Sequence, residues 1–484
     1  MVDIKMYINS LFNAKNILIP TTKQNLLDEF VRSVDCQEAV NSIIENQNFI
    51  MEKWKIKNRV ADIISHQIVI PNGTIGKHYE AKIDFNKLNF TDLLFETFEG
   101  LEELGLSFNK VNSAIEGTPT QSGDFKIKLI FKIKGESEST SPNEKLISLI
   151  INPDPKSLWK DIPSDTNDLF WKKDDVTEAA SLGDRHIVVA SKRGRSHENV
   201  GSFRDDDFAY KYFEKTGWSV VAVSDGAGSY SLSRIGSQLA CNAVLDYFEN
   251  HHDVEQNKEF ESKLIAFNES KDEMLLKEIE IASKQNLYKA TLHVHNKIKE
   301  HAEITSKEHP ELFNNPKAKT LLDYYHSTLI FALFKKYEFG YVLQTFGVGD
   351  CPIAIMNKDQ SQTTLLNWLD VGEFGGGTRF ITQPNIFHSK EHPMASRFNF
   401  QIVTDFSYLF LMTDGIYDPK FVVEANLEKN GKWIEFMEDL QGNNEDNLKV
   451  DFDYSNTEIS NQLSNWMDFW SQGNHDDRTL AIVY

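Results

Sequence analysis

The spacing of hydrophobic residues changes along the 484-residue chain. Up to about residue 65, apolar residues recur at intervals of three and four, as in the run LLDEFV that begins at Leu26, and this spacing predicts helices. From 66 to about 155 the period falls to two, most clearly in 125–133, which reads FKIKLIFKI. Because such alternation is typical of half-buried strands, we predict a helical segment over 1–65 and a small all-β sandwich over 66–155.

The rest of the chain mixes short apolar runs with helical patterns. Residues 152–168 contain three prolines and several acidic residues, which predicts a linker, placed over 156–180. Beyond it, six apolar runs predict strands over 187–191, 218–224, 327–334, 341–349, 408–413 and 479–484. Helical patterns occupy 231–251, 255–310 and 457–471. The prediction is a multidomain α+β protein whose largest domain, 181–484, contains both strands and helices.

Composition narrows the class of protein. With 40% hydrophobic residues, 33 Phe and 8 Trp, the chain has enough apolar side chains for large cores, which excludes a disordered protein. Its 72 Asp and Glu against 51 Lys and Arg give a net charge of −21, which disfavours nucleic acid and anionic membranes as partners. Three scattered cysteines predict neither disulfides nor a zinc site. The lack of an export signal and of any apolar run of about 18 residues predicts a cytoplasmic protein.

Aspartates stand at the ends of the predicted strands. Asp225, Asp350 and Asp414 each follow an apolar run directly, and Asp476 lies three residues before the last run. The run Asp205-Asp206-Asp207 precedes another short strand-like segment. Because strand ends can converge at one edge of a sheet pair, these carboxylates are candidate ligands for hard divalent cations such as Mg²⁺ and Mn²⁺.

Such a group of carboxylates indicates hydrolytic chemistry. Two divalent ions about 4 Å apart can share a hydroxide that attacks phosphorus in line. In the turn DGAGS, Gly226 and Gly228 allow the backbone to approach a metal or a phosphate closely. Each motif alone is weak, because Asp-Gly is foremost a turn dipeptide and three consecutive aspartates are typical of a solvated surface. Their order along the chain carries the interpretation.

The motifs GRSHEN, DDDF, DGAGS, GVGDC, MTDGIYD and DDRT follow one another within residues 184–484. Together they resemble the metal-dependent protein phosphatase family, type 2C, and in particular its bacterial branch. The resemblance implies a four-layer α-β-β-α sandwich, in which two antiparallel sheets pack together between outer helices. It also implies two Mn²⁺ or Mg²⁺ ions with a third site, and hydrolysis of phosphoserine or phosphothreonine on protein substrates in bacterial signalling. A cognate Ser/Thr kinase is then an expected partner.

The resemblance also assigns roles to single residues. Asp225 corresponds to the carboxylate that bridges both metals, and the carbonyl oxygen of Gly226 to a ligand of the second ion. Asp414 and Asp476 resemble the two terminal carboxylates of the first ion. Asp225 and Asp414 are therefore the expected centre of catalysis.

Further roles follow from the other motifs. Asp206 matches the aspartate that supports the second ion, and Asp207 is the rival because the run of three leaves the register open. Asp350 matches the aspartate linked to the third metal, where Asp418 could assist. Arg195 resembles the arginine whose planar guanidinium grips two phosphate oxygens.

Two positions depart from the family pattern. Ala227 replaces a His that animal members often have, so this turn offers no general acid. Asp477 stands where Asn is usual. Three histidines near the motifs are predicted to be ordinary loop or core residues, namely His197, His326 and His475. The glycine-rich segment GEFGGGTRFITQPN lacks the Lys-Ser/Thr of a phosphate-binding loop, and we predict a flap beside the site.

A second resemblance covers about 90 residues. The segments IPNGTIGKHYEAKI and LGLSFNKVNSAIEGTPTQSGDFKIKL are similar to a bacterial immunoglobulin-like repeat. It implies a fold for 66–155 and no activity.

Two other functions compete with an active phosphatase. A catalytically inactive phosphatase fold that binds a phosphoprotein would be marked by loss of a metal aspartate, and none is missing. A structural or adhesive protein would be marked by an export signal or tandem repeats, and neither is present. The substrate and the oligomeric state are not given by the sequence.

Overall fold

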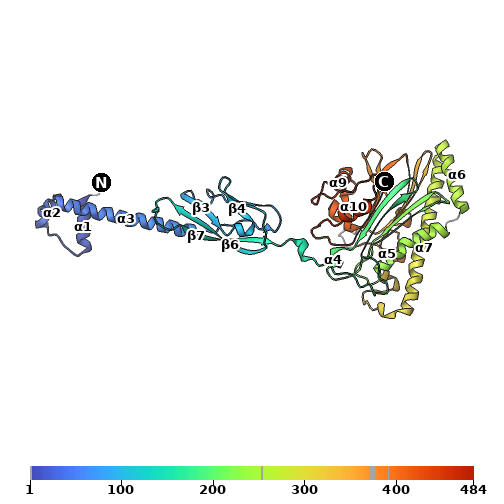
Figure 1. Ribbon diagram of the computed structural model, residues 1–484, viewed down its shortest axis with the longest axis horizontal. Helices are drawn as coiled ribbons and strands as arrows, with labels where there is room; N and C mark the ends of the chain where they lie inside the picture. The colour runs from blue at the N-terminus through green and yellow to red at the C-terminus, as the bar shows by residue number, and fades with distance from the viewer. Residues whose placement is uncertain (1–2, 252–253, 371–376, 391) are drawn as a thin grey trace. The chain divides into compact units, whose positions relative to one another are not determined.

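The computed structural model describes residues 3–251, 254–370, 377–390 and 392–484 (Figure 1). Contacts divide the chain into two units, Met1–Leu158 and Trp159–Tyr484, which are described separately. Part of the predicted glycine-rich flap, residues 372–376, lies outside the described residues. Among the helices described here, none is both long and apolar enough to cross a membrane.

The first unit begins with helices, as the hydrophobic spacing predicts. They are α1 (Ile4–Ala14), α2 (Gln24–Arg32) and α3 (Val34–Ser65). Asp3 and Ser33 cap α1 and α3, since their side chains accept hydrogen bonds from backbone N–H groups of the first turn. A small core formed by Ile8, Leu27 and Val40 holds the three helices together.

The strands of this unit form two sheets over one core. The first sheet has the order β1 (Gly73–Thr74), β7 (Asn143–Asn152), β6 (Gly123–Ile133), β3 (Leu93–Glu99), and the second has the order β2 (Tyr79–Lys82), β5 (Ala114–Gly117), β4 (Leu106–Asn109). The alternating run 125–133 lies in β6, where every second residue, Ile127, Leu129, Phe131 and Ile133, belongs to the core. The core includes Ile63, so the end of α3 packs with the sheets. The immunoglobulin-like relationship stays a prediction.

The second unit contains two antiparallel sheets, and all six predicted strand runs lie in them. The five-stranded sheet has the order β10 (Asp207–Phe213), β11 (Trp218–Ser224), β12 (Leu329–Tyr337), β13 (Gly340–Val348), β16 (Phe398–Val403). The six-stranded sheet has the order β15 (Thr363–Leu365), β14 (Ile353–Asn357), β17 (Phe406–Met412), β18 (Arg478–Val483), β9 (Arg185–Lys192), β8 (Asp175–Leu182). Residues of both sheets, such as Val189, Val223 and Leu411, share one core.

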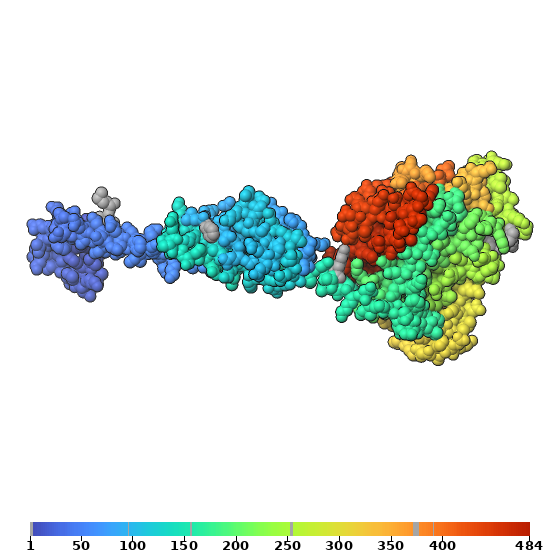
Figure 2. Space-filling view, viewed as in Figure 1, coloured from blue at the N-terminus to red at the C-terminus, as the bar shows by residue number. Residues whose placement is uncertain are grey.

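Helices cover the outer sides of these sheets. The five-stranded sheet shares a core with α5 (Ser233–Asp246), α6 (Val254–Ser270) and α7 (Glu273–Glu308). The six-stranded sheet shares another with α8 (Asp414–Phe421), α9 (Asn430–Leu440) and α10 (Ile459–Trp466). Figure 1 shows α9 and α10 on one side of the strands and α6 and α7 on the other. In the space-filling view of Figure 2, the red C-terminal residues and the yellow-green residues of the middle of the chain accordingly lie on opposite sides of the second unit.

The predicted helix over 255–310 is in fact two helices. Lys271 has a φ of 56°, which no α-helix continues, and the Asp272 side chain then caps α7 by accepting a hydrogen bond from the N–H of Met274 at 2.8 Å. The hydrophobic spacing did not reveal this break.

The predicted linker also differs from the structure. Residues from Trp159 onward belong to the second unit, and β8 is an edge strand paired with β9. Lys172 is buried, where it donates a hydrogen bond to the carbonyl oxygen of Asp206 at 2.7 Å and forms an ion pair with Asp207 at 3.0 Å. A polar segment therefore folds onto the unit because its charged residue finds partners there.

Candidate active site

The structure brings five of the predicted aspartates together. Asp225 and Asp350 follow β11 and β13, Asp414 opens α8 after β17, and Asp206 and Asp476 precede β10 and β18. Burial raises the pKa of Asp225 well above its usual range, and the charges of the other four carboxylates raise it further. Groups that affect one pKa in this way lie close together, so aspartates from five segments meet at one place. These five aspartates are called the acidic group below.

These carboxylates lack the partners that buried acids normally have. The Oδ1 atoms of Asp206, Asp350 and Asp414 are buried, and among the described residues none has a hydrogen-bond partner. The pKa of Asp414 is likewise raised well above its usual range, first by burial and then by the neighbouring carboxylates. A divalent cation would relieve both the repulsion and the missing interactions. Oxygen donors are the ligands that Mg²⁺ and Mn²⁺ prefer, so the residues fit such ions.

The turn at Asp225 is held tightly against the start of β12. The Asp225 N–H donates to Oγ1 of Thr328 at 2.9 Å, and the Thr328 N–H donates to the Asp225 carbonyl oxygen at 2.8 Å. A Cβ atom on Gly226 would lie 2.7 Å from the carbonyl oxygen of Asp205. Only glycine fits there, because backbone cannot move aside as a flexible side chain can.

The run of three aspartates points its side chains in different directions. Oδ2 of Asp206 accepts hydrogen bonds from the hydroxyls of Thr413 and Thr479, each at 2.8 Å, beside the other acidic residues. Asp207 instead pairs with Lys172. Of the two rivals, Asp206 is the one that lies in the acidic group.

Asp350 lies close enough to Asp418 for its charge to act on that residue. Burial raises the pKa of Asp418, and the charge of Asp350 raises it further. Oδ2 of Asp350 accepts a hydrogen bond from the Thr378 hydroxyl at 2.7 Å. Asp350 and Asp225 also offer oxygen atoms within 4.8 Å of each other and of the Cys351 sulfur. Burial raises the pKa of the Cys351 thiol well above its usual range, so the oxygens are the relevant donors.

The sequence did not reveal the partners of His197 and Asp477. Asp477 is buried and accepts hydrogen bonds from the N–H groups of Gly194 and Asp205, each at 2.5 Å. Its Oδ1 lies 3.0 Å from Nδ1 of His197. Burial lowers the pKa of His197, but its bond to Asp477 and the surrounding carboxylates outweigh this and raise the pKa to about 9. The pair joins the segment after β9 to the segment before β18.

Arg195 lies beside the segment that carries Asp476. Its guanidinium donates to the carbonyl oxygens of Asp468 at 2.9 Å and Phe469 at 3.3 Å, and lies over the Trp470 ring. It forms no ion pair with any described carboxylate. The structure therefore places this predicted phosphate-binding residue near the acidic group, with part of its donors already used by the protein.

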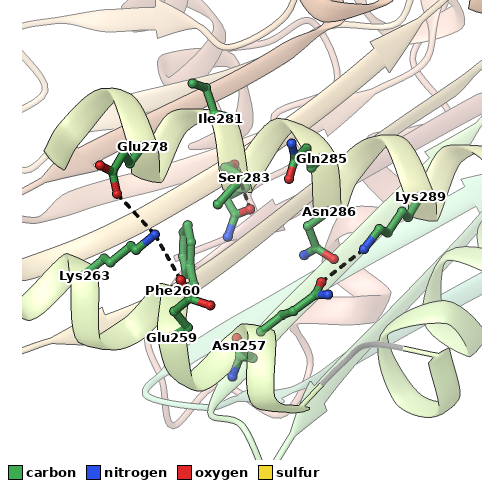
Figure 3. Close-up of a pocket in the computed structure, with 13 residues that line it drawn as sticks. Asn257, Glu259, Phe260, Lys263, Glu278, Ile281, Ser283, Gln285, Asn286 and Lys289 are labelled. Atoms are coloured by element: carbon green, nitrogen blue, oxygen red, sulfur yellow. Dashed lines mark hydrogen bonds and ion pairs between the residues drawn. The ribbon is translucent and has the colours of Figure 1, made fainter. Parts of the chain in front are cut away.

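An open groove lies beside the turn that follows Asp225. Its volume is about 390 Å³, and Asp205, Gly228, Ser229 and Tyr230 are among the residues that line it. A separate cavity of about 400 Å³ lies between α6 and α7 and is lined mostly by amide and charged side chains (Figure 3). None of the predicted site residues lines that second cavity.

The comparisons with known proteins agree with the motifs. The profile of the protein phosphatase 2C family matches residues 193–468. No curated protein sequence matches the chain.

Several solved structures match this chain at low sequence identity. The serine/threonine phosphatase Stp1 from Staphylococcus aureus is 13% identical, with a TM-score of 0.33, over 65% of this chain and 98% of its own. The catalytic domain of the serine threonine protein phosphatase PstP, in complex with two manganese ions, is 14% identical, with a TM-score of 0.35, over 64% of this chain and 98% of its own. The S. agalactiae serine/threonine phosphatase is 14% identical, with a TM-score of 0.36, over 62% of this chain and 99% of its own. Since the family profile covers more than half of the 484 residues, the chain belongs to the protein phosphatase 2C family.

Proposed function

We propose that this protein hydrolyses phosphoserine or phosphothreonine on a protein substrate, in bacterial signalling, with Mn²⁺ or Mg²⁺ as cofactor. The observation that carries the proposal is the group of five aspartates from five segments, three of which have a buried oxygen without a hydrogen-bond partner in the part of the chain that the structure describes. Among the described residues, no Lys or Arg forms an ion pair with any of the five. A binding module without metal chemistry would gain no advantage from such an arrangement.

The same residues would hold the ions. Asp225 would bridge two of them, with Asp414 and Asp476 on the first and the Gly226 carbonyl oxygen on the second. Asp206 would support the second ion, and Asp350 would hold a third with help from Asp418. When bound, the ions lower the pKa of water, so that hydroxide is available near neutral pH, and they neutralise phosphate charge.

The protein's own residues would bind and orient the substrate. Arg195 would grip phosphate oxygens with the donors that its backbone contacts leave free, and its stacking on Trp470 limits where the guanidinium can go. The open groove beside Gly228 would receive the peptide on either side of the phosphorylated residue. Because Ala227 offers no proton donor, the proton for the leaving hydroxyl would come from another group or from solvent.

The proposal includes the four-layer α-β-β-α arrangement for the second unit. Three separate cores support it, one between the sheets and one between each sheet and its helices. The partners in this proposal are a phosphorylated protein and a cognate kinase that supplies it.

The test is hydrolysis by the full-length protein of para-nitrophenyl phosphate and of a phosphothreonine peptide. Turnover is expected with Mn²⁺ or Mg²⁺ and is expected to vanish with EDTA. The variant Asp414→Asn should lose roughly a thousandfold in rate, about 4 kcal/mol of transition-state stabilisation, because it removes a charge from the metal site.

The matched control is Asp359→Asn, which changes an exposed aspartate in a surface turn and should leave the rate unchanged. If folded, metal-supplied protein shows no turnover but still binds the phosphopeptide, the catalytically inactive alternative is correct.

A further inference from the structure

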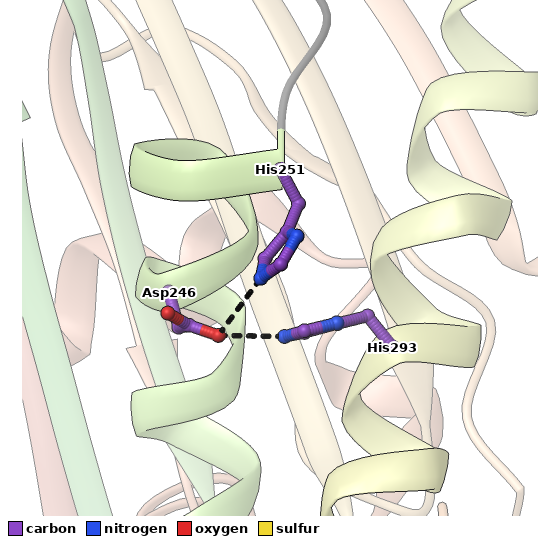
Figure 4. A group of neighbouring side chains, drawn as sticks. All are labelled: Asp246, His251 and His293. Atoms are coloured by element: carbon purple, nitrogen blue, oxygen red, sulfur yellow. Dashed lines mark hydrogen bonds and ion pairs between the residues drawn. The ribbon is translucent and has the colours of Figure 1, made fainter.

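A second cluster of metal-binding residue types lies between the end of α5 and α7 (Figure 4). Asp246 is the last residue of α5, His251 ends the π-helical turn that follows, and His293 lies within α7. Nε2 of His293 lies 2.8 Å from Oδ2 of Asp246, and Nε2 of His251 lies 3.6 Å from the same oxygen. The three ligand atoms are all within 4.8 Å of one another.

The π-helical turn Tyr247–His251 is what brings two of these residues to one side. In an α-helix, residues five apart, such as Asp246 and His251, point about 140° away from each other. In a π-helix the hydrogen bonds run from residue i to i+5, so residues five apart lie on the same side of the helix. Figure 4 shows both side chains directed toward His293 on the facing helix.

The carboxylate of Asp246 is held in place by its own neighbour. Nδ2 of Asn250 donates to Oδ1 at 2.9 Å, which leaves Oδ2 directed at the two imidazoles. The bond from Asn250 also holds the pKa of Asp246 below its usual range, with a smaller contribution from His293.

The histidines are also well placed. The His293 ring packs against the Tyr247 ring at 5.8 Å, and the Tyr247 hydroxyl donates to Oδ1 of Asn286 at 3.2 Å. The rings of His251 and His293 lie 4.6 Å apart. The side chain of His251 is 51% exposed and that of His293 16%, so an ion can reach the cluster from solvent. The contact with Tyr247 limits the positions that the His293 imidazole can take.

We propose that Asp246, His251 and His293 bind one transition-metal ion of the zinc class, with a fourth position open to water. Two imidazoles and one carboxylate are a ligand set that suits Zn²⁺, whereas Mg²⁺ prefers oxygen alone. The ion would replace the hydrogen bond between Asp246 and His293. The bound ion would connect the C-terminal end of α5 to α7. The N-terminal end of α5 follows the turn at Asp225, which belongs to the acidic group.

The experiment measures zinc binding rather than catalysis. Metal-free full-length protein is titrated with Zn²⁺ by calorimetry, in excess Mg²⁺ and in the Asp414→Asn background, so that zinc at the acidic group is distinguished from zinc at the helices. One Zn²⁺ is expected to bind, and His251→Ala and His293→Ala are each expected to weaken it by at least about tenfold. Asn250→Ala removes the positioning bond and should weaken binding roughly tenfold while keeping the one-to-one stoichiometry.

The matched control is His309→Ala. His309 also lies near a carboxylate, at 3.2 Å from Glu311, but among the described residues it belongs to no group of three potential metal ligands. It should bind zinc as the parent does. Substitution of Co²⁺ gives a second readout, because its visible absorption is intense in four-coordinate sites and should fade in the two histidine variants only. If both variants bind Zn²⁺ with the parent's affinity and stoichiometry, or if the parent binds none, the proposal is wrong. Should His293→Ala fail to fold, the exposed His251 decides the result.

Discussion

Asp350 and Asp370 both neighbour Gly349, and they differ in how the protein compensates a buried carboxylate. Both oxygens of Asp370 face the guanidinium of Arg397, at 2.5 and 2.8 Å, and the Gly349 N–H donates to one of them at 2.8 Å. Asp350 receives only the Thr378 hydroxyl, and its other oxygen has no hydrogen-bond partner among the described residues. Burial raises the pKa of Asp350 above its usual range. One aspartate has a cation supplied by the chain, and the other does not.

The same contrast separates Asp207 from Asp206, which are adjacent in the sequence. Asp207 pairs with the buried Lys172, whereas Asp206 joins the acidic group. A carboxylate that has a built-in cation contributes to the fold. A carboxylate that has none, beside others in the same state, costs stability and marks a site for an external cation.

The largest expected effect on stability comes from breaking the built-in pair. Arg397→Met leaves the charge of Asp370 buried and unpaired, which should cost about 3–5 kcal/mol of unfolding free energy. The measurement is urea denaturation in EDTA, in which the unfolding transition of the second unit is monitored.

The companion variant for this comparison is Asp414→Asn under the same metal-free conditions. A raised pKa means that the ionised form is disfavoured in the folded state, so removing the charge should cost nothing or should stabilise the protein. The contrast between the two kinds of carboxylate fails if both variants lose stability equally.

The next effect is the gain in stability when metal is added. Mn²⁺ at about 100 times its dissociation constant should stabilise the wild-type protein by about 2.7 kcal/mol, because it binds the folded state only. In Asp225→Asn the gain should largely disappear, since the proposed bridging ligand is lost. Thermal unfolding with and without Mn²⁺ measures both. An equal gain in Asp359→Asn and in the wild type confirms that surface carboxylates do not contribute, whereas an equal gain in Asp225→Asn contradicts the proposed centre.

The positions of strands and of the acidic residues were predictable because both signals are local. An apolar run followed at once by Asp225 or Asp414 predicts a strand and a carboxylate at its end, and the structure contains both. The partners of buried charges were not predictable in this way. Lys172 meets Asp207 across 35 residues and His197 meets Asp477 across 280, and no spacing rule connects such pairs. For the same reason, the segment 156–180, which we predicted to be a linker, is partly folded onto the second unit.

Other features escaped because the deviation from regular structure is small. The break at Lys271 and the π-helical turn after Asp246 both occur inside sequences with continuous helical spacing. The turn is nevertheless what aligns Asp246 with His251. Hydrophobic periodicity reports which face of a helix is buried, and it is insensitive to one extra residue in a turn.

The smallest expected effect concerns a partly exposed pair in the first unit. Arg59 on α3 donates two hydrogen bonds to Asp92, both at 2.8 Å, and the bond from Arg59 is the main cause that holds the pKa of Asp92 below its usual range. A lowered folded-state pKa stabilises the protein above the unfolded-state pKa, near 3.9, and the contribution is lost as the pH falls through the folded value. Asp92→Asn should therefore cost about 1 kcal/mol or less at pH 7, in contrast to Arg397→Met, because solvent screens the pair.

The measurement for this pair is urea unfolding at several pH values between 7 and 3, in which the transition of the first unit is monitored. The difference between wild type and Asp92→Asn should shrink once the pH drops below about 4, where the unfolded aspartate binds protons while the folded one is still ionised. Glu80→Gln is the control, because Glu80 faces Lys82 at 3.5 Å on a more exposed surface and should change stability very little. A difference for Asp92→Asn that stays constant down to pH 3 would mean that packing of the side chain, rather than its charge, connects α3 to the sheet.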